Sequence, residues 1–272
     1  MNDNNSEKKN LAIIKIRENK IDEAESILSE IKDSKSYFNA AIVLEKMNKI
    51  DLAIKFYDSS IEIDPNYFPS FINKNKLIEK KGNITQAIQC LNDALKIKTN
   101  LQYIAYYQLG NLYSKLLDYK KLLKLYIKSY KLNKDFLLSL HNIGNILEEF
   151  GKFRFSLKAY NLLIDEAKKR NILDDFPKTL LNRSLLLIKS GNYKDGLRDY
   201  EHRWLTPEFK NRKKNFGVET WKKNQDISGK TLLVFNEQGL GDTIYFFCFL
   251  NKLTKKNIKV VFLIQKPLKD LF

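Results

Sequence analysis

The residues best suited to chemistry lie in one glycine-rich segment towards the C-terminal end of the sequence, Glu237-Gln238-Gly239-Leu240-Gly241-Asp242-Thr243. We predict a buried strand over Thr231–Phe235 before it and a helix over Thr243–Leu253 after it. A turn between such elements brings backbone N–H groups and a helix N-terminus together, and α/β enzymes hold ligands at such turns. The segment therefore predicts a substrate-binding loop, with ligand contacts from Glu237, Gln238, Gly239, Gly241 and Thr243.

Two common nucleotide-binding motifs do not fit this loop. A dinucleotide fingerprint needs a third small residue where Ile244 stands, and Gln265 takes the place of its acidic ribose partner. A P-loop is excluded because no Gly-Lys-Ser/Thr follows the glycines. Asp242 would repel a pyrophosphate, and its residue type alone is equally compatible with a helix N-cap.

A βαβ unit is predicted to position the loop. Its second strand, Lys259–Ile264, is a continuous apolar run, as expected for a parallel strand covered on both faces. A single unit needs further strands and covering helices, so we expect residues 229–272 to be the incomplete first part of an α/β domain. Residues 206–228 predict a linker, in which Trp221 should dock on a neighbouring surface.

Upstream of the linker the sequence repeats with a period near 34 residues. Five anchor positions, mostly small, recur along the chain: Ala41, Asn75, Gly110, Gly144 and Ser184. Sixteen residues after each anchor stands a large residue: Tyr57, Leu91, Tyr126, Tyr160 and Tyr200. Turn residues separate the two halves of each unit, which predicts stacked pairs of antiparallel helices.

This pattern resembles the tetratricopeptide repeat over residues 5–205. The resemblance implies a mainly α fold, with an α-solenoid of five full units after a shortened first unit at residues 5–33. That first unit carries Ala24 and Leu28 at the equivalent places. The longer interval between Gly144 and Ser184 predicts an extended loop near Ala167–Asp175.

A row of side-chain amides lies two residues before the anchors, at Asn39, Asn73, Gln108, Asn142 and Asn182. We call these five residues the amide row, and in a solenoid they should line the concave surface. Amide donors and acceptors match the alternating groups of an extended peptide backbone, which predicts peptide binding. Capping of helices or bridging of neighbouring repeats is an equally open alternative. The row resembles the asparagine array inside the O-GlcNAc transferases.

A second resemblance begins near residue 193 and runs to the end of the sequence. It rests on Tyr200-Glu201-His202-Arg203-Trp204, on Gly229-Lys230-Thr231-Leu232-Leu233 and on the glycine-rich loop with Asp242 and Thr243. These segments resemble bacterial tetratricopeptide proteins that continue into a heptosyltransferase-like domain. The resemblance implies a GT-B fold of two Rossmann-like domains, a nucleotide-sugar donor, and Asp242 as a candidate general base. Cys248 departs from it, since the family often has arginine there.

Composition excludes other classes of protein. No apolar run is long enough for a membrane span and no signal peptide is evident, so we expect a cytoplasmic location. Cys90 and Cys248 should be buried and, like the distant His141 and His202, have no pattern of metal ligands, so we expect no metal and no cofactor in this chain. The net charge of +16 comes mostly from lysines spread over many helices, which disfavours specific nucleic-acid binding.

Three functions follow as hypotheses, of which a basic RNA-binding solenoid is the third. The first is an interaction module whose solenoid binds an extended peptide or partner protein, attached to the first piece of a glycosyltransferase-like domain. The second is a nucleotide-sugar-dependent glycosyltransferase when full length, acting on protein or on a cell-envelope glycan. We expect the catalytic domain to be truncated in this sequence, so that the chain alone has no transferase activity.

Overall fold

The computed structural model describes residues 2–212, 214–221, 225–237, 239–250, 253 and 258–272. Its first two hundred residues form successive antiparallel helix pairs, each pair being one repeat. The pairs are α1 (Asn2–Arg17) with α2 (Ile21–Ile31), α3 (Ser34–Lys46) with α4 (Ile50–Ile63), α5 (Phe68–Lys80) with α6 (Ile84–Ala94), α7 (Gln102–Lys115) with α8 (Tyr119–Leu132), α9 (Leu138–Glu149) with α10 (Phe153–Lys169), and α11 (Pro177–Lys189) with α12 (Tyr193–Tyr200).

The turn inside each repeat has a common backbone conformation. The seventh residue after the anchor has a positive φ, which favours glycine or asparagine because a Cβ is crowded there. Those residues are Asn48, Gly82, Leu117, Gly151 and Gly191, and Asn19 holds the same place in the first pair. Asp or Asn then caps several second helices, as where Asn83 Oδ1 accepts from the backbone N–H of Gln86. The repeated turn therefore sets the antiparallel pairing.

Each anchor lets the two helices of its repeat come close together. A Cβ added to Gly110 would lie 2.5 Å from the Tyr126 ring, and one added to Gly144 would lie 2.2 Å from the Tyr160 ring. Both rings are buried against these glycines. The chain thus places its smallest residue opposite its largest, which explains the sixteen-residue spacing.

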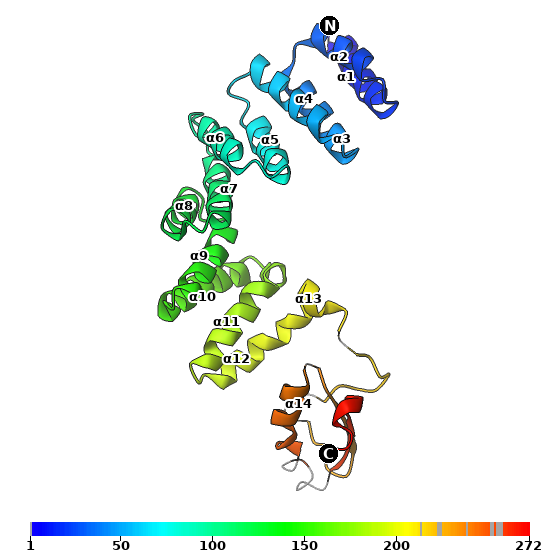
Figure 1. Cartoon of the computed structure of the whole chain (residues 1–272), viewed down its shortest axis with the longest axis vertical. Helices are drawn as coiled ribbons and strands as arrows, with labels where there is room; N and C mark the ends of the chain where they lie inside the picture. Colours follow the sequence, from blue (N-terminus) through cyan, green and yellow to red (C-terminus); the bar gives the residue numbers. More distant parts are fainter. Residues whose placement is uncertain (1, 213, 222–224, 238, 251–252, 254–257) are drawn as a thin grey trace.

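The stacked pairs form an arc (Figure 1). The first helices α3, α5 and α7 lie on its inner side, and the second helices α4, α6 and α8 lie on its outer side (Figure 1). The buried core runs as a series of clusters between neighbouring helices, as expected for a solenoid. Anchors and amide row both belong to the first helices, of which α3, α5 and α7 lie on the inner side of the arc (Figure 1).

The long interval before the last repeat is mainly helix, and the extended loop predicted at Ala167–Asp175 is wrong in its first part. Helix α10 continues to Lys169, and a 3₁₀ turn, η1 (Leu173–Asp175), follows. Leu163, Ile164 and Ala167 are fully buried. Continuing the helix buries this apolar stripe, which a loop would expose.

The C-terminal segment forms a small parallel α/β unit after η2 (Glu201–Leu205) and α13 (Pro207–Lys210). Strand β1 (Thr231–Phe235) and strand β2 (Lys259–Leu263) pair in parallel, with Leu233 opposite Val261. Helix α14 (Leu240–Phe247) follows β1, and a 3₁₀ turn, η3 (Lys266–Leu268), follows β2. Figure 1 shows this unit beyond the end of the solenoid.

Several expectations for this unit need correction. Helix α14 begins at Leu240, so Gly241, Asp242 and Thr243 are in its first turn. Trp221 stays 46% exposed instead of docking closely on a neighbouring surface, and its indole N–H donates to the Gln225 backbone carbonyl. One face of β2 is uncovered, with Val261 and Leu263 exposed.

The two cysteines differ in environment. Cys90 is buried as predicted, and burial raises the pKa of its thiol to about 11. Cys248 is exposed, because it follows a short helix whose outer side has no covering element in the described part of the unit. Across the described ranges no helix is long and apolar enough to cross a membrane, and no group of side chains forms a metal site.

Candidate functional site

The amide row lies on the first helices of five successive repeats, and four of its members contact the neighbouring repeat. Asn182 Nδ2 donates to Asn145 Oδ1 at 2.8 Å, and Asn142 Nδ2 donates to Asn111 Oδ1 at 3.4 Å. Each bond joins the row member to an amide one repeat earlier. The bridging alternative is therefore present in the structure, and peptide binding stays a prediction.

Buried tyrosines complete these inter-repeat contacts. The Tyr126 hydroxyl donates to Asn111 Oδ1 at 2.7 Å, and the Tyr160 hydroxyl donates to Asn145 Oδ1 at 2.7 Å. Burial raises the pKa of both phenols, so the hydroxyls remain protonated donors. The Tyr57 hydroxyl instead donates to Glu45 Oε2 at 3.2 Å and is also hydrogen-bonded by Asn73 of the next repeat. Asn111 Oδ1 and Asn145 Oδ1 thus each accept hydrogen bonds from a tyrosine of the same repeat and from a row amide of the next repeat. These shared bonds fix the orientation of Asn142 and Asn182.

The repeat with Leu91 uses a different arrangement. Leucine has no hydroxyl, and in this repeat the anchor itself is an amide, Asn75. Asn75 Nδ2 donates to Gln108 Oε1 at 3.2 Å, so the contact to the next repeat is kept. The buried Asn75 Oδ1 has no hydrogen-bond partner among the described atoms. The coincidence of Asn75 and Leu91 in one repeat is the sequence signal for this substitution.

Asn39 begins the row and differs from the other four residues. Its side chain is exposed, whereas those of Asn73, Gln108, Asn142 and Asn182 are half-buried. Its amide is therefore open to solvent at one end of the row. A substitution at Asn39 changes the row while leaving the contacts between later repeats in place.

His141 extends the polar network at the fifth repeat. Asn145 Nδ2 donates to His141 Nε2 at 3.1 Å, so Nδ1 carries the proton and donates to Thr179 Oγ1 at 2.8 Å. Burial, and to a smaller extent the nearby Lys178, lowers the pKa of the imidazole. His141 is therefore a neutral structural group that links α9 to α11.

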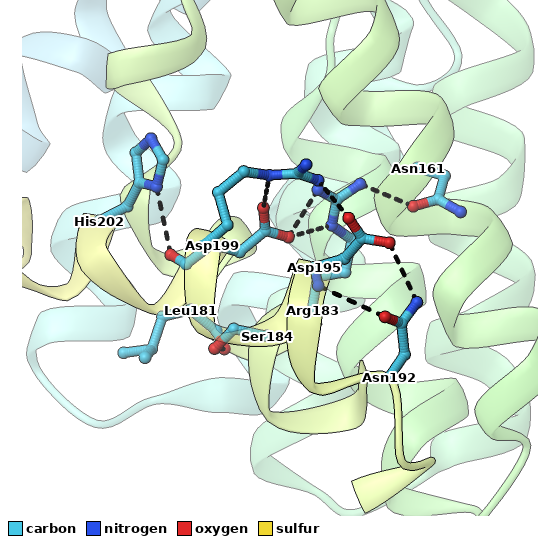
Figure 2. Close-up of polar contacts among 9 residues, drawn as sticks. Asn161, Leu181, Arg183, Ser184, Asn192, Asp195, Asp199 and His202 are labelled. Atoms are coloured by element: carbon cyan, nitrogen blue, oxygen red, sulfur yellow. Dashed lines mark hydrogen bonds and ion pairs between the residues drawn. The ribbon is translucent and has the colours of Figure 1, made fainter. Parts of the chain in front are cut away.

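A buried ion pair orders the last repeat (Figure 2). Arg183 Nε donates to Asp199 Oδ2 at 2.7 Å, and Arg183 Nη1 donates to Asn161 Oδ1 at 2.8 Å. The Asp199 side chain is only 5% exposed. These residues come from α11, α12 and α10, so one guanidinium joins three helices next to Asn182. Nothing in the repeat pattern predicts this pair.

The glycine-rich loop leads into α14, whose N-terminus has no side-chain cap. Gly239 is the N-cap residue in an extended conformation, and Asp242 is exposed in the first turn. Asp242 is thus not the N-cap, although an acid in the first turn still favours the helix dipole. Thr243 is buried, and its hydroxyl bonds the Gly239 carbonyl at 3.0 Å and Gln265 Oε1 at 3.1 Å. Gln238, predicted to contact ligand, lies outside the described residues.

Glu237, the first residue of the loop, is held by the repeat domain. Arg203 Nε and Nη2 donate to its two carboxylate oxygens at 2.8 and 2.7 Å. Arg203 also donates to the Tyr200 carbonyl and lies 4.4 Å from the Tyr200 ring centroid and 4.2 Å from the Trp204 ring centroid. We call this bidentate contact the Arg203–Glu237 clamp. The sequence predicted a ligand role for Glu237, whereas the structure gives it an internal partner.

A cleft of about 610 Å³ lies between the last repeat and the glycine-rich loop. The amide row ends beside it, because Leu181 and Leu185 flank Asn182 on α11 and line the cleft. Asp242 lines the opposite side. The walls are formed by Leu181, Leu185, Tyr200, Phe209, Arg212, Glu237, Gly239 and Asp242.

Comparisons with known proteins agree with the repeat architecture. Residues 34–67, which contain α3 and α4, match the family model of the tetratricopeptide repeat. A TPR repeat-containing protein of Methanocaldococcus jannaschii is 28% identical over 171 residues, covering 58% of this chain and 30% of that protein. The chain thus spans less than a third of the length of that curated relative.

Solved structures share the fold at low sequence identity. A PilF structure from Pseudomonas aeruginosa superposes with a TM-score of 0.60 at 14% identity, covering 77% of this chain and 96% of that one. A MamA structure gives 0.51 at 16% identity, covering 70% and 98%. The repeated helix pairs and these structures show the fold of a tetratricopeptide-repeat solenoid, and residues 34–67 match the tetratricopeptide-repeat model itself.

Proposed function

We propose that the inner side of the solenoid binds an extended peptide, or an extended segment of a partner protein, through the amide row. The observation that carries the proposal is the fixed orientation of the row. Contacts between repeats hold Gln108, Asn142 and Asn182 in place before any ligand arrives. A preorganised surface loses less conformational entropy on binding than a mobile one.

The hydrogen-bonding capacity of the row supports the same proposal. Each amide has two N–H donors and a carbonyl acceptor. Some of these groups already bond neighbours, since Asn142 contacts Asn111, Tyr107 and Tyr126, and Asn182 contacts Asn145 and Tyr160. A ligand can engage the others, and an extended backbone presents alternating carbonyl and N–H groups. Such binding depends little on ligand side chains.

Substitution of the row tests this function. The chain and its Asn39→Ala, Asn73→Ala and Asn142→Ala variants would be titrated with a mixed library of unstructured peptides. We expect weaker binding for each variant with unchanged helical circular dichroism. The matched control is Gln89→Ala, which removes an exposed amide from α6 on the outer side. Equal peptide binding by all variants contradicts the proposal.

We propose a second function, glycosyl transfer from a nucleotide sugar, for a protein in which this α/β unit is part of a complete glycosyltransferase domain. The parallel pairing of β1 with β2, joined through α14, supports it, and so does the place of Asp242 on the cleft. Asp242 would then accept a proton from the acceptor hydroxyl, a role worth about 10²–10⁴ in rate. In such a protein, Asp242→Asn should lower the rate of transfer of labelled sugar to protein by about 10²–10⁴. Unchanged transfer rules out the assigned base.

Specific nucleic-acid binding is not proposed, in spite of the positive charge. We expect retention on RNA, if any, to fall steeply with salt and to be independent of sequence. Gel-shift titrations at two salt concentrations would measure this, and a salt-resistant, sequence-dependent complex would contradict it.

A further inference from the structure

The Arg203–Glu237 clamp joins two parts of the chain that are 34 residues apart in sequence. Its arginine belongs to η2, directly after the last repeat, and its glutamate belongs to the glycine-rich loop. The Arg203 side chain is only 8% exposed, and that of Glu237 is 23% exposed. A buried, charge-assisted contact of this kind is more specific in geometry than a surface ion pair.

The partners of Arg203 leave its guanidinium little freedom. It lies against the Tyr200 and Trp204 rings, donates to the Tyr200 carbonyl and pairs with Glu201 at 3.0 Å. The planar fork then meets both oxygens of Glu237, a match that lysine cannot reproduce. Arg203 therefore fixes the position and the direction of the Glu237 carboxylate.

Glu237 is two residues before Gly239, the N-cap residue of α14, and the clamp therefore limits where the loop can lie. The cleft has Leu181 and Tyr200 on one side and Gly239 and Asp242 on the other. These two sides face each other only while the loop stays against the last repeat. The hydrogen bond between Thr243 and Gln265 orders the loop within the α/β unit but does not join the loop to the repeats. The clamp supplies that connection.

We propose that Arg203 is a positioning residue that holds the glycine-rich loop against the last repeat, so that the repeat domain forms one wall of the cleft in front of Asp242. A ligand of the loop then touches the solenoid as well, and its body would meet Leu181, Leu185 and Phe209 while its polar groups meet Asp242 and Arg212. This fits a hydroxyl-bearing side chain with an apolar stem. The ligand assignment rests on the proposed function, whereas the positioning role does not.

Distance measurement in the full chain tests the positioning role. Cys248 is exposed and Cys90 is buried, so a spin label reacts at Cys248, and Lys194→Cys adds a second label on α12. We expect one narrow distance distribution between the labels in the otherwise unchanged chain. Arg203→Lys and Glu237→Gln should each broaden it, because either change removes the bidentate contact. Arg198→Lys, a change at an exposed arginine, should leave it narrow.

Hydrogen exchange provides the second readout. The Thr243 amide, which donates to the Gly239 carbonyl at 3.2 Å, should exchange roughly tenfold faster in Arg203→Lys and in Glu237→Gln. The double variant should add little, since both changes remove one interaction. Glu237→Gln leaves the repeats untouched, so a folding defect of the Arg203 variant cannot mimic this result. An unchanged distance distribution, or faster exchange spread equally over α11 and α12, overturns the proposal. Neither outcome depends on peptide binding by the amide row.

Discussion

At the scale of single residues, the repeat depends on matched pairs of anchor and partner. Gly110 and Gly144 have no Cβ, and the Tyr126 and Tyr160 rings occupy the space that a Cβ would need. In the repeat with a larger anchor, Asn75, the partner is the smaller Leu91. In that repeat the larger anchor is matched by a smaller partner, although Ala41 and Ser184 keep a tyrosine at this position.

Gly144→Ala tests this match. Alanine favours a helix over glycine by about 1 kcal/mol, so without a clash the variant would be more stable. We expect the opposite, a loss of about 1–3 kcal/mol from overpacking against Tyr160, measured by urea unfolding. The loss should shrink in a Tyr160→Leu background, which copies the natural Asn75 and Leu91 repeat. A stabilised Gly144→Ala variant would contradict the account.

His141 makes stability depend on pH. Its folded-state pKa is lowered from the ordinary 6.5 by burial, so the unfolded chain binds a proton more readily. The stability that neutral His141 contributes is complete above pH 6.5 and is lost as the pH falls towards the lowered pKa. Urea midpoints should decline over this window more steeply in the unchanged chain than in His141→Gln. Parallel declines would show that His141 is not responsible.

At the scale of elements, helices were predictable from spacing, whereas their exact ends were not. The sixteen-residue spacing and the turn residues predicted each helix pair, because both are local requirements of close packing. The end of α10 depends on burial of Leu163, Ile164 and Ala167 against other helices, which a period in the sequence does not reveal. The start of α14 at Leu240 differs for a similar reason, since Thr243 is fixed by Gln265 from beyond β2.

Removing half of the buried ion pair should weaken the last repeat. Asp199→Asn leaves the Arg183 charge buried without its counter-charge, which costs about 3–5 kcal/mol. Hydrogen exchange should accelerate in α11 and α12 and remain unchanged in α1–α6, because a repeat contacts only its neighbours. The matched control is Asp51→Asn, in an exposed pair with Lys81, where little change is expected. Acceleration throughout the solenoid would argue against separable repeats.

At the scale of the whole molecule, the amide row extends from α3 to α11, and Leu181 and Leu185 of α11 line the cleft. The amide row could be predicted as a register, but the sequence did not decide between bridging and binding. That choice depends on which groups of each amide are already engaged by tyrosines of the preceding repeat. The Arg203–Glu237 clamp was equally hidden, because its residues are far apart and belong to different elements.

The central claim is that the amide row binds an extended peptide on the inner side of the solenoid. Nuclear magnetic resonance of the side-chain amides tests it most directly, during titration with the tightest peptide from the library. The account predicts shifts for the amides of Asn39, Asn73, Gln108, Asn142 and Asn182, and none for Gln86 and Gln89 on the outer helix α6. Shifts confined to outer-side amides, with the row unmoved while peptide binds, would contradict it.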